Sequence, residues 1–467
     1  MPASRDPSAE QARQLIQLYS QGNLQQALAS ANQLLSSFPE SSFLHNILGA
    51  THAGLGQVDA AIDSYRQALR LMPNDAKTHF NLGIALNDKG DLQAAIECYE
   101  NALKLDSGYV PAYNNLGNAL KDEGHLARAI ASYKKALEVE PGYAEVHNNL
   151  GNALKDSGEL EQAIGSYQKA LQYLPDYAEA YNNLGGAYKD KADLEQARNC
   201  YRQALEIRPD YGDAAWNMVG TAEVIDDAEN WANRCLVIDR EHVVAKLQLC
   251  VINYFKGDSG SFEELTRSDL NDHPVMRSLK WVTEFQELPE LYFNRWSLFD
   301  SVIASSVQDR PFYEFGVFRG QAFKYLIATF KQGFGFDTFE GLPEDWYAEK
   351  AGSYSSAGKI PEIAGGEFVA GKFEDTLPEF FSQPRQVASV INFDADLYSS
   401  TLCALNHSKC VMDSQTILVF DELIVNENWE QDEYRALNEF CAANNLTYEL
   451  LAISFFTKQV AIRLIGI

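Results

Sequence analysis

The sequence predicts an array of paired α-helices followed by an α/β domain whose doubly wound sheet has seven strands. Two observations predict this fold class. From residue 312 onward, short apolar runs alternate with helical segments, which is typical of a parallel sheet with helices on both faces. In the first half, prolines recur at intervals that are multiples of 34 residues, a helix–turn–helix repeat length. These prolines are Pro39, Pro73, Pro141, Pro175 and Pro209.

The composition indicates an acidic protein of two or three globular domains. Its 467 residues include 38 Lys and Arg against 65 Asp and Glu, a formal net charge of −27, and 46% are hydrophobic. This acidity excludes a general nucleic-acid binder and disfavours anionic membrane surfaces, because both require a surplus of Lys and Arg. We see no secretory signal, no membrane-spanning run and no CxxC pair among the seven cysteines. We therefore expect a cytoplasmic protein without disulfides or zinc.

Each repeat of the first half is predicted to be two helices that pack against each other. In Tyr109–Gly142, apolar and small residues fall on one face of each helix, Gly124 lies in the turn and Pro141 ends the unit. In spacing, small residues and closing prolines, residues 41–210 resemble the tetratricopeptide (TPR) family. The resemblance implies a right-handed superhelix with a concave groove, spanning 1–242 with degenerate repeats at both ends.

The groove carries one asparagine per repeat on the first helix. A carboxamide both donates and accepts hydrogen bonds, so such a row suits an extended protein or peptide ligand, and a similar row lines the TPR superhelix of O-linked N-acetylglucosamine transferases. The same amides can instead join neighbouring helices as scaffold, and both interpretations stay open. The residues are Asn81, Asn115, Asn149, Asn183 and Asn217.

After a helical connector, 243–306, the α/β domain is predicted to span 307–467. The final two strands are almost contiguous, which predicts an antiparallel hairpin at the end of an otherwise parallel sheet. The seven predicted strands are Phe312–Gly316, Gly335–Asp337, Glu367–Ala370, Ala388–Phe393, Thr416–Phe420, Tyr448–Phe456 and Lys458–Leu464.

The turn after the first of these strands predicts a nucleotide-type ligand. Glu314, Gly316 and Gly320 form an ExGxxxG pattern before a helix, and glycines let a ligand approach the backbone there. The second strand ends at Asp337, 21 residues after Gly316, where a carboxylate can accept from ribose hydroxyls. A nicotinamide-dependent oxidoreductase shares this layout, but it prefers GxGxxG, and the terminal hairpin is a mark of class I S-adenosylmethionine-dependent methyltransferases.

Four separated strings sharpen this prediction. They are GFDTFEGLPEDW from Gly335, GKFEDTLP from Gly371, FDADLYSST from Phe393 and VFDE from Val419. In this order and spacing, residues 288–467 resemble the macrocin O-methyltransferase-like family, class I enzymes that methylate sugar hydroxyls. A Met412-Asp413-Ser414-Gln415 turn replaces the family's usual Pro-Gly before the fifth strand.

The resemblance implies a role for ten residues. Glu314, Gly316 and Gly320 would hold the methionine end of S-adenosyl-L-methionine, Asp337 the ribose, and Gly371 with Phe373 the adenine. Asp394, Asp421 and Glu422 match the family's divalent-metal ligands, and Asp396 matches its proposed general base.

The residue chemistry agrees with the metal and base roles. Asp394 ends the fourth strand and Asp421 ends the fifth, so both should project over the carboxyl edge of the sheet, where ligands bind. Carboxylate oxygens suit Mg²⁺, and a hydroxyl on that ion loses its proton more easily. The simpler alternative is that the aspartates only cap the following helix. His407 is expected to be a bystander.

We expect an S-adenosylmethionine-dependent, Mg²⁺-assisted O-methyltransferase acting on a hydroxyl, with a sugar or glycoconjugate favoured. The repeat array would recruit the acceptor or a partner protein. The alternative is a non-catalytic TPR scaffold for protein–protein interaction with a vestigial methyltransferase domain. The glycine- and serine-rich segment 346–366 is either a lid over the site or a long insertion.

Overall fold

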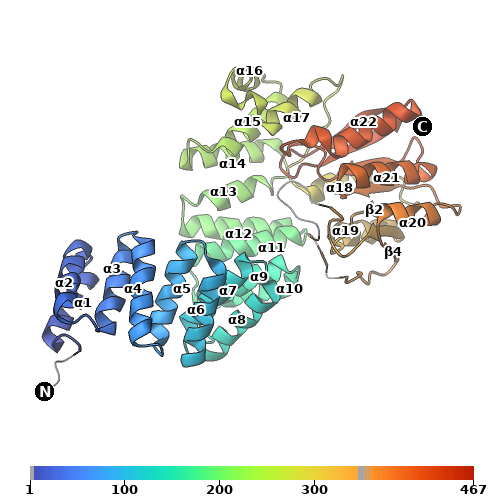
Figure 1. Ribbon diagram of the computed structural model, residues 1–467. Coiled ribbons are helices and arrows are strands. Elements are labelled where there is room, and N and C mark those ends of the chain that lie inside the picture. The colour runs from blue at the N-terminus through green and yellow to red at the C-terminus, as the bar shows by residue number, and fades with distance from the viewer. Residues whose placement is uncertain (1–4, 345–351, 353–354, 357) are drawn as a thin grey trace. The chain divides into compact units, whose positions relative to one another are not determined.

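The computed structural model describes residues 5–344, 352, 355–356 and 358–467, so the segment 346–366 lies partly outside the described residues. Contacts divide the chain into two compact units: the first ends at Ala187 and the second comprises Tyr188–Ile467 (Figure 1).

The first unit is a stack of helix pairs (Figure 1). From α1 to α10 each helix contacts the next along the chain, and the first helices α3, α5, α7 and α9 also contact one another in succession. This packing confirms the predicted helix–turn–helix repeats. The helices are α1 Ala9–Ser20, α2 Leu24–Ser37, α3 Ser42–Gly54, α4 Val58–Leu71, α5 Ala76–Asp88, α6 Leu92–Leu105, α7 Val110–Asp122, α8 Leu126–Val139, α9 Ala144–Asp156, α10 Leu160–Tyr173 and α11 Ala178–Asp190.

A glycine and a tyrosine form a close contact inside four of the repeats. A Cβ added to Gly117 on α7 would lie 2.4 Å from the ring of Tyr133 on α8. The ring is fully buried, and its hydroxyl donates to Asn118 Oδ1 at 2.6 Å. Only glycine leaves room for the ring at this distance. The same contact recurs 34 residues on, at Gly151 and Tyr167, which is why the period is visible in the sequence.

Gly117→Ala is expected to destabilise the first unit by about 1–3 kcal/mol, because the added methyl group must displace a buried ring. The matched control is Gly165→Ala in α10, where an added Cβ meets no atom within 4 Å. That change should stabilise the helix by about 0.5–1 kcal/mol. Urea unfolding followed by far-ultraviolet circular dichroism measures both, and equal effects would contradict the packing argument.

The second unit begins with the end of α11 and contains the last helices of the repeat region. It continues through a helical segment into a sheet with its covering helices. The helices are α12 Leu194–Ile207, α13 Gly212–Val219, α14 Ile225–Ile238, α15 Val243–Phe255, α16 Gly260–Thr266, η1 Asp269–Asp272, α17 Pro274–Val282, α18 Arg295–Ala304, α19 Gln321–Phe330, α20 Phe373–Phe380, α21 Tyr398–Ser408, η2 Lys409–Val411, η3 Trp429–Gln431 and α22 Glu433–Asn444.

The sheet has eight strands in the described residues, in the order β1-β7-β8-β6-β5-β2-β3-β4. All neighbours are parallel except β8, which runs antiparallel to both β6 and β7. The strands are β1 Glu290–Leu291, β2 Phe312–Phe315, β3 Gly333–Asp337, β4 Gly366–Ala370, β5 Val390–Phe393, β6 Ile417–Phe420, β7 Thr447–Ile453 and β8 Val460–Ile465. The predicted strands and terminal hairpin are therefore present.

The prediction of seven strands was wrong by one. Strand β1 has only two residues, too few to show an alternating pattern, and it pairs with β7 far along the chain. Helices cover both faces of the sheet, as the apolar strands require. Tyr313 and Phe315 of β2 pack toward α20, α21 and α22, while Phe312 packs toward α18 and α19.

The last repeat helices share a hydrophobic core with the segments around the sheet. Val219 and Ile252 of α13 and α15 pack with Phe293, which precedes α18. Leu194, the first residue of α12, packs against the core of α18, α19 and their face of the sheet. The predicted boundary at 242 follows the repeat pattern, whereas the compact unit starts at Tyr188 because of these contacts.

In the described residues, no helix combines the length and apolarity that crossing a membrane requires.

Candidate functional site

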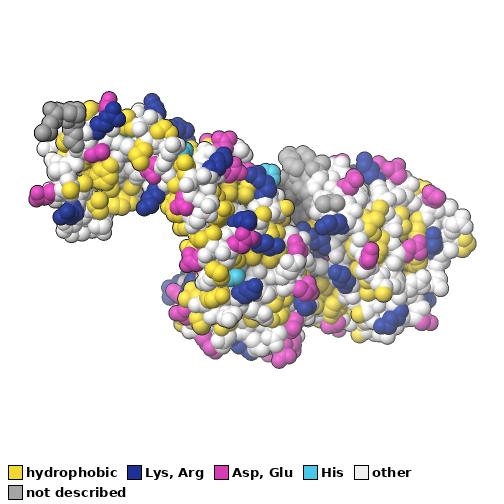
Figure 2. All heavy atoms as spheres, turned by 90° about the horizontal axis from the view of Figure 1, so that it is seen from below, with side chains coloured by type: hydrophobic (Ala, Val, Ile, Leu, Met, Phe, Trp, Pro, Cys, Tyr) yellow, Lys and Arg dark blue, Asp and Glu magenta, His cyan; other side chains and the backbone are white. Residues whose placement is uncertain are grey.

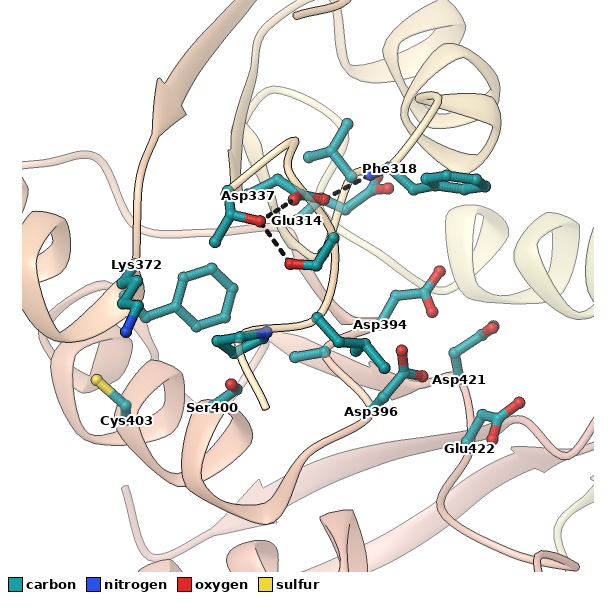
Figure 3. Close-up of a pocket in the computed structure, with 18 of the residues that line it drawn as sticks. Glu314, Phe318, Asp337, Lys372, Asp394, Asp396, Ser400, Cys403, Asp421 and Glu422 are labelled. Atoms are coloured by element: carbon teal, nitrogen blue, oxygen red, sulfur yellow. Dashed lines mark hydrogen bonds between the residues drawn. The ribbon is translucent and has the colours of Figure 1, made fainter. Parts of the chain in front are cut away.

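A cavity of about 620 Å³ opens at the carboxyl ends of β2, β3, β5 and β6 (Figure 3). In the sheet order, β2 and β5 are neighbours with crossovers leaving in opposite directions, which is where doubly wound sheets bind ligands. Eight of the ten predicted site residues line it: Glu314, Gly316, Asp337, Phe373, Asp394, Asp396, Asp421 and Glu422.

Gly316 allows two strand ends to meet at the floor of this cavity. Its φ is +91°, and an added Cβ would lie 1.8 Å from the carbonyl oxygen of Asp394. The Asp394 amide also donates to the carbonyl oxygen of Phe315 at 2.8 Å. Any side chain at 316 would separate the ends of β2 and β5, so glycine is required for packing as well as for ligand approach.

Glu314 presents a buried carboxyl group to the cavity. Only 1% of the residue is exposed, and its Oε2 has no hydrogen-bond partner in the described structure. Burial raises the pKa of Glu314 well above its usual range, while the Arg295 guanidinium opposes that rise. A buried acceptor without a partner is costly, so this oxygen suits a ligand that brings a donor or a positive charge.

Asp337 is held in place by two backbone amides. Its Oδ2 accepts from the Phe318 amide at 2.7 Å (Figure 3), and its Oδ1 accepts from the Phe339 amide at 2.7 Å. Both donors have positive φ values, +49° and +57°, a conformation that folds each loop back onto the carboxylate. Because a carboxylate oxygen accepts more than one bond, each oxygen can still accept from a ligand hydroxyl.

Four acidic side chains gather on one side of the cavity: Asp394, Asp396, Asp421 and Glu422 (Figure 3). Asp396 has a φ of +58°, an uncommon conformation for a non-glycine residue that sets the direction of its side chain. Burial, followed by the charges of Glu422 and Asp421, raises the pKa of Asp396 to about 8. Burial and the Asp421 charge raise the pKa of Asp394 well above its usual range.

Two cationic side chains and an amide, none of them predicted, bind this acidic group. Arg295 Nη2 lies 2.5 Å from Asp421 Oδ2, and Gln459 Nε2 donates to Asp421 Oδ1. Lys458 Nζ lies 3.3 Å from Glu422 Oε1. The Asp421 charge is the main reason that the pKa of Arg295 is raised. Arg295, Gln459 and Lys458 are far along the chain from the carboxylates that they contact, so no local sequence motif predicts these contacts.

The predicted metal ligands have the right oxygen chemistry for Mg²⁺, but two of the three, Asp421 and Glu422, are already paired. Both oxygens of Asp421 are engaged, and Asn426 Nδ2 donates to Glu422 Oε2 at 2.6 Å. No group of three His, Cys, Asp or Glu side chains in the described ranges is arranged to hold a metal ion. An ion at this place would have to displace Arg295 and Lys458 from their carboxylates.

The remaining predicted site residues serve the loops around the cavity. Gly320, with φ +70°, precedes α19, and Gly371, with φ +138°, donates its amide to the Asp337 carbonyl oxygen at 2.9 Å. Neither lines the cavity. Phe373 does, with its ring packed at a steep angle on Phe315. His407 does not line it, and its Nδ1 lies 2.9 Å from the Cys403 carbonyl oxygen.

In the repeat array, two of the predicted asparagines join neighbouring helices. Asn149 Nδ2 donates to Asn114 Oδ1 at 3.0 Å, and Asn183 Nδ2 donates to Asn148 Oδ1 at 3.0 Å. These bonds favour the scaffold interpretation at both positions.

Figure 2 shows acidic and basic side chains mixed over the face in view.

Comparison with known proteins identifies the repeats. A TPR repeat model matches residues 49–87, 85–124, 117–158 and 151–192, and a tetratricopeptide repeat model matches 178–211. These matches confirm the predicted repeats in this range. They give no support to the predicted methyltransferase domain, and no curated protein matches the chain.

Solved structures similar to this chain cover a third to a half of it. MamA is 30% identical with a TM-score of 0.34, and the match covers 35% of this chain and 95% of MamA. YrrB, described as a TPR protein with an unusual peptide-binding site, is 21% identical with a TM-score of 0.35, covering 39% of this chain and 95% of YrrB. The C-terminal part of a TPR protein from Cytophaga hutchinsonii is 20% identical with a TM-score of 0.43, covering 50% of this chain and 97% of that structure.

The TM-scores of these solved structures are too low to support an argument about function. The matches to the repeat models therefore identify the repeats. Residues 49–211 of this chain are an array of tetratricopeptide repeats, a scaffold for protein–protein interaction.

Proposed function

We propose that the cavity binds S-adenosyl-L-methionine and that the protein transfers its methyl group to a hydroxyl of an acceptor, with a sugar or glycoconjugate favoured. The repeat array would recruit the acceptor or a partner protein. The observation that carries this proposal is the buried carboxyl of Glu314, a residue that lines the cavity and whose Oε2 lacks a hydrogen-bond partner in the described structure. The cofactor's methionine end carries an ammonium group, which would supply the missing donor and charge.

The charge of the cavity supports a cationic ligand over a pyrophosphate. Eight carboxyl groups line it, against three cations, Arg295, Arg319 and Lys372. The acidic residues are Glu314, Asp337, Glu344, Glu374, Asp394, Asp396, Asp421 and Glu422. Both the sulfonium and the ammonium of S-adenosylmethionine are attracted to such a site, whereas the two phosphates of a nicotinamide cofactor are repelled. The oxidoreductase alternative is therefore disfavoured.

Each residue has a role in the proposed reaction. Asp337, fixed by two amides, would accept from the ribose hydroxyls, and the ring of Phe373 would pack on the adenine. Bound S-adenosylmethionine supplies a methyl group on a positively charged sulfur. Asp396 would take the proton of the acceptor hydroxyl while the acceptor oxygen bonds to the methyl carbon. The carbon–sulfur bond breaks with its electron pair going to sulfur, which leaves as a neutral thioether.

The proposal includes Mg²⁺ at Asp394, Asp421 and Glu422, but neither proton removal by Asp396 nor methyl transfer depends on the ion. Its binding requires that Arg295 and Lys458 first leave these carboxylates. An ion would then supply the acceptor oxygen with a second means of losing its proton.

Calorimetric titration of the full chain with S-adenosylmethionine tests the proposal. We expect micromolar binding, and about a 10- to 100-fold loss of affinity in Glu314→Gln, since a hydrogen bond to a charged group contributes about 1.5–3 kcal/mol. The matched control is Glu367→Gln on the exposed side of β4, which should leave affinity unchanged. No binding to the wild-type protein would exclude the enzyme.

The metal is tested in the same titration by adding Mg²⁺ and the variant Asp394→Ala. If the ion binds at this place, heat of Mg²⁺ binding is expected in the wild-type protein and not in the variant. Identical titrations of the two proteins would contradict the metal assignment and leave the cofactor proposal standing.

The second candidate is a non-catalytic scaffold with a vestigial methyltransferase domain. The matches at 49–211 favour it over the enzyme, because they support protein interaction directly while methyl transfer is supported only by the cavity. Retention of the carboxylates in the cavity speaks for the enzyme. The cofactor titration separates the two, since a scaffold requires no S-adenosylmethionine binding.

A further inference from the structure

Besides the nearby Asn426, two distant chain segments supply donors that hold Asp421 and Glu422. The first is the start of α18, where Arg295 reaches Asp421 Oδ2 at 2.5 Å. The second is the connection between β7 and β8, where Lys458 reaches Glu422 and Gln459 reaches Asp421. The acidic pair is thus held from two directions by segments outside the strand that carries it.

The first of these segments is also attached to the end of the repeat array. Trp296, the neighbour of Arg295, is buried, and its Nε1 donates to the carbonyl oxygen of Lys189 at 2.7 Å. Lys189 lies in the last turn of α11. Successive residues of α18 therefore bind a repeat helix on one side and the acidic pair on the other.

The second segment has the same arrangement. Phe456, two residues before Lys458, has its ring centroid 5.0 Å from that of Trp216 on α13. A Cβ added to Gly220 at the end of α13 would lie 2.5 Å from the Phe456 ring, so the ring fits only because residue 220 is glycine. The repeat helix and the β7–β8 connection are in direct contact.

We propose that Trp296 and Phe456 are positioning residues through which the end of the repeat array, residues 188–220, holds the acidic pair of the site in place. Arg295 and Lys458 are long side chains that lose rotamer freedom when they bind a carboxylate. Anchoring the backbone next to each of them lowers that cost and preorganises the pair. The part that the acidic pair plays in the reaction rests on the proposed function. The contacts that hold the pair in place do not depend on it.

Hydrogen exchange of the full chain tests the first anchor. Trp296→Phe removes the indole N–H and keeps most of the ring; amides in 421–426 are expected to exchange at least fivefold faster, with β5 unchanged. The matched control is Trp429→Phe, because Trp429 is equally buried and its Nε1 has no partner in the described structure. Exchange within twofold of wild type at 421–426, or an equal increase across the whole sheet, would overturn the proposal.

A single methyl group on the repeat tests the second anchor. Gly220→Ala pushes on the Phe456 ring and is expected to speed exchange at 457–460 at least fivefold. Gly212→Ala, at the other end of α13, is the control, since its added Cβ meets only Ile238 at 4.0 Å. If Gly220→Ala acts no differently from Gly212→Ala, this anchor does not exist.

The rate of methyl transfer gives the functional readout. Both Trp296→Phe and Gly220→Ala are expected to slow methyl transfer at saturating S-adenosylmethionine more than tenfold, with cofactor affinity within threefold of wild type, because the residues assigned to the cofactor, Glu314 and Asp337, lie on β2 and β3 and not on the segments that the two anchors hold. Unchanged transfer would overturn the positioning role. If no variant and no wild-type protein binds the cofactor, the proposed function fails, and the exchange experiments still decide whether residues 188–220 hold the pair.

Discussion

Asp396→Asn is expected to lower the rate of methyl transfer by about 10²- to 10⁴-fold, the range in which a positioned general base contributes. Asparagine keeps the size of the side chain and its place after β5 but cannot take a proton. Binding of S-adenosylmethionine should remain within threefold of wild type, because Asp396 is not among the residues assigned to the cofactor. Single-turnover transfer of a labelled methyl group to a glycan acceptor measures the rate.

The pH dependence gives a second readout for the same residue. With the pKa of Asp396 raised to about 8 by burial and by the Glu422 and Asp421 charges, the wild-type kcat/KM should rise with pH up to about that value. Stability has the opposite sign: a carboxyl whose folded pKa is raised loses stability as pH climbs from its unfolded value, about 4, to about 8. Asp396→Asn should flatten both profiles, and an unchanged rate profile would exclude Asp396 as the base.

Gly316→Ala is expected to destabilise the second unit by about 3–5 kcal/mol and to remove ligand binding. Two costs add at this position. The backbone has φ +91°, which costs a residue with a Cβ about 1–2 kcal/mol. The Cβ would also lie 1.8 Å from the Asp394 carbonyl oxygen, so the ends of β2 and β5 must separate.

Gly257→Ala separates these two costs. Gly257 has a similar φ of +88°, but an added Cβ there meets no atom within 4 Å, so only the backbone cost of about 1–2 kcal/mol is expected. All six tryptophans lie in the second unit, beginning at Trp216, so urea unfolding followed by tryptophan fluorescence reports on that unit. Equal losses in the two variants would show that the approach of the strand ends is not tight.

Local patterns predicted the repeats and most of the sheet. The period of 34 residues is visible because successive repeats bury the same small and aromatic residues between their two helices, as at Gly117 and Tyr133. Seven strands were predicted from apolar runs bounded by turns. Strand β1 was missed because two residues show no alternation, and its partner β7 lies far along the chain.

The site residues that lie at the ends of strands could be predicted from the sequence. Parallel strands place their carboxyl ends at one edge, so the order of Glu314, Asp337, Asp394 and Asp421 along the chain was enough to bring them together. The sequence could not show that Asp421 is bound by Arg295, which is 126 positions away. That pairing changes the chemistry, because two of the three carboxylates expected to bind Mg²⁺, Asp421 and Glu422, are engaged by side chains of the chain itself.

By itself, the sequence determined the helix pairs, the strands and the residues at the strand ends, since each depends on side-chain spacing over a few turns or strands. Only the tertiary structure decided which charges are neutralised, which carboxyl oxygen of Glu314 lacks a partner, and where the compact unit begins. The reason is physical: a charge or a buried oxygen is satisfied by whatever lies within about 3 Å. At Arg295, Trp296 and Phe456, those neighbours come from distant parts of the chain.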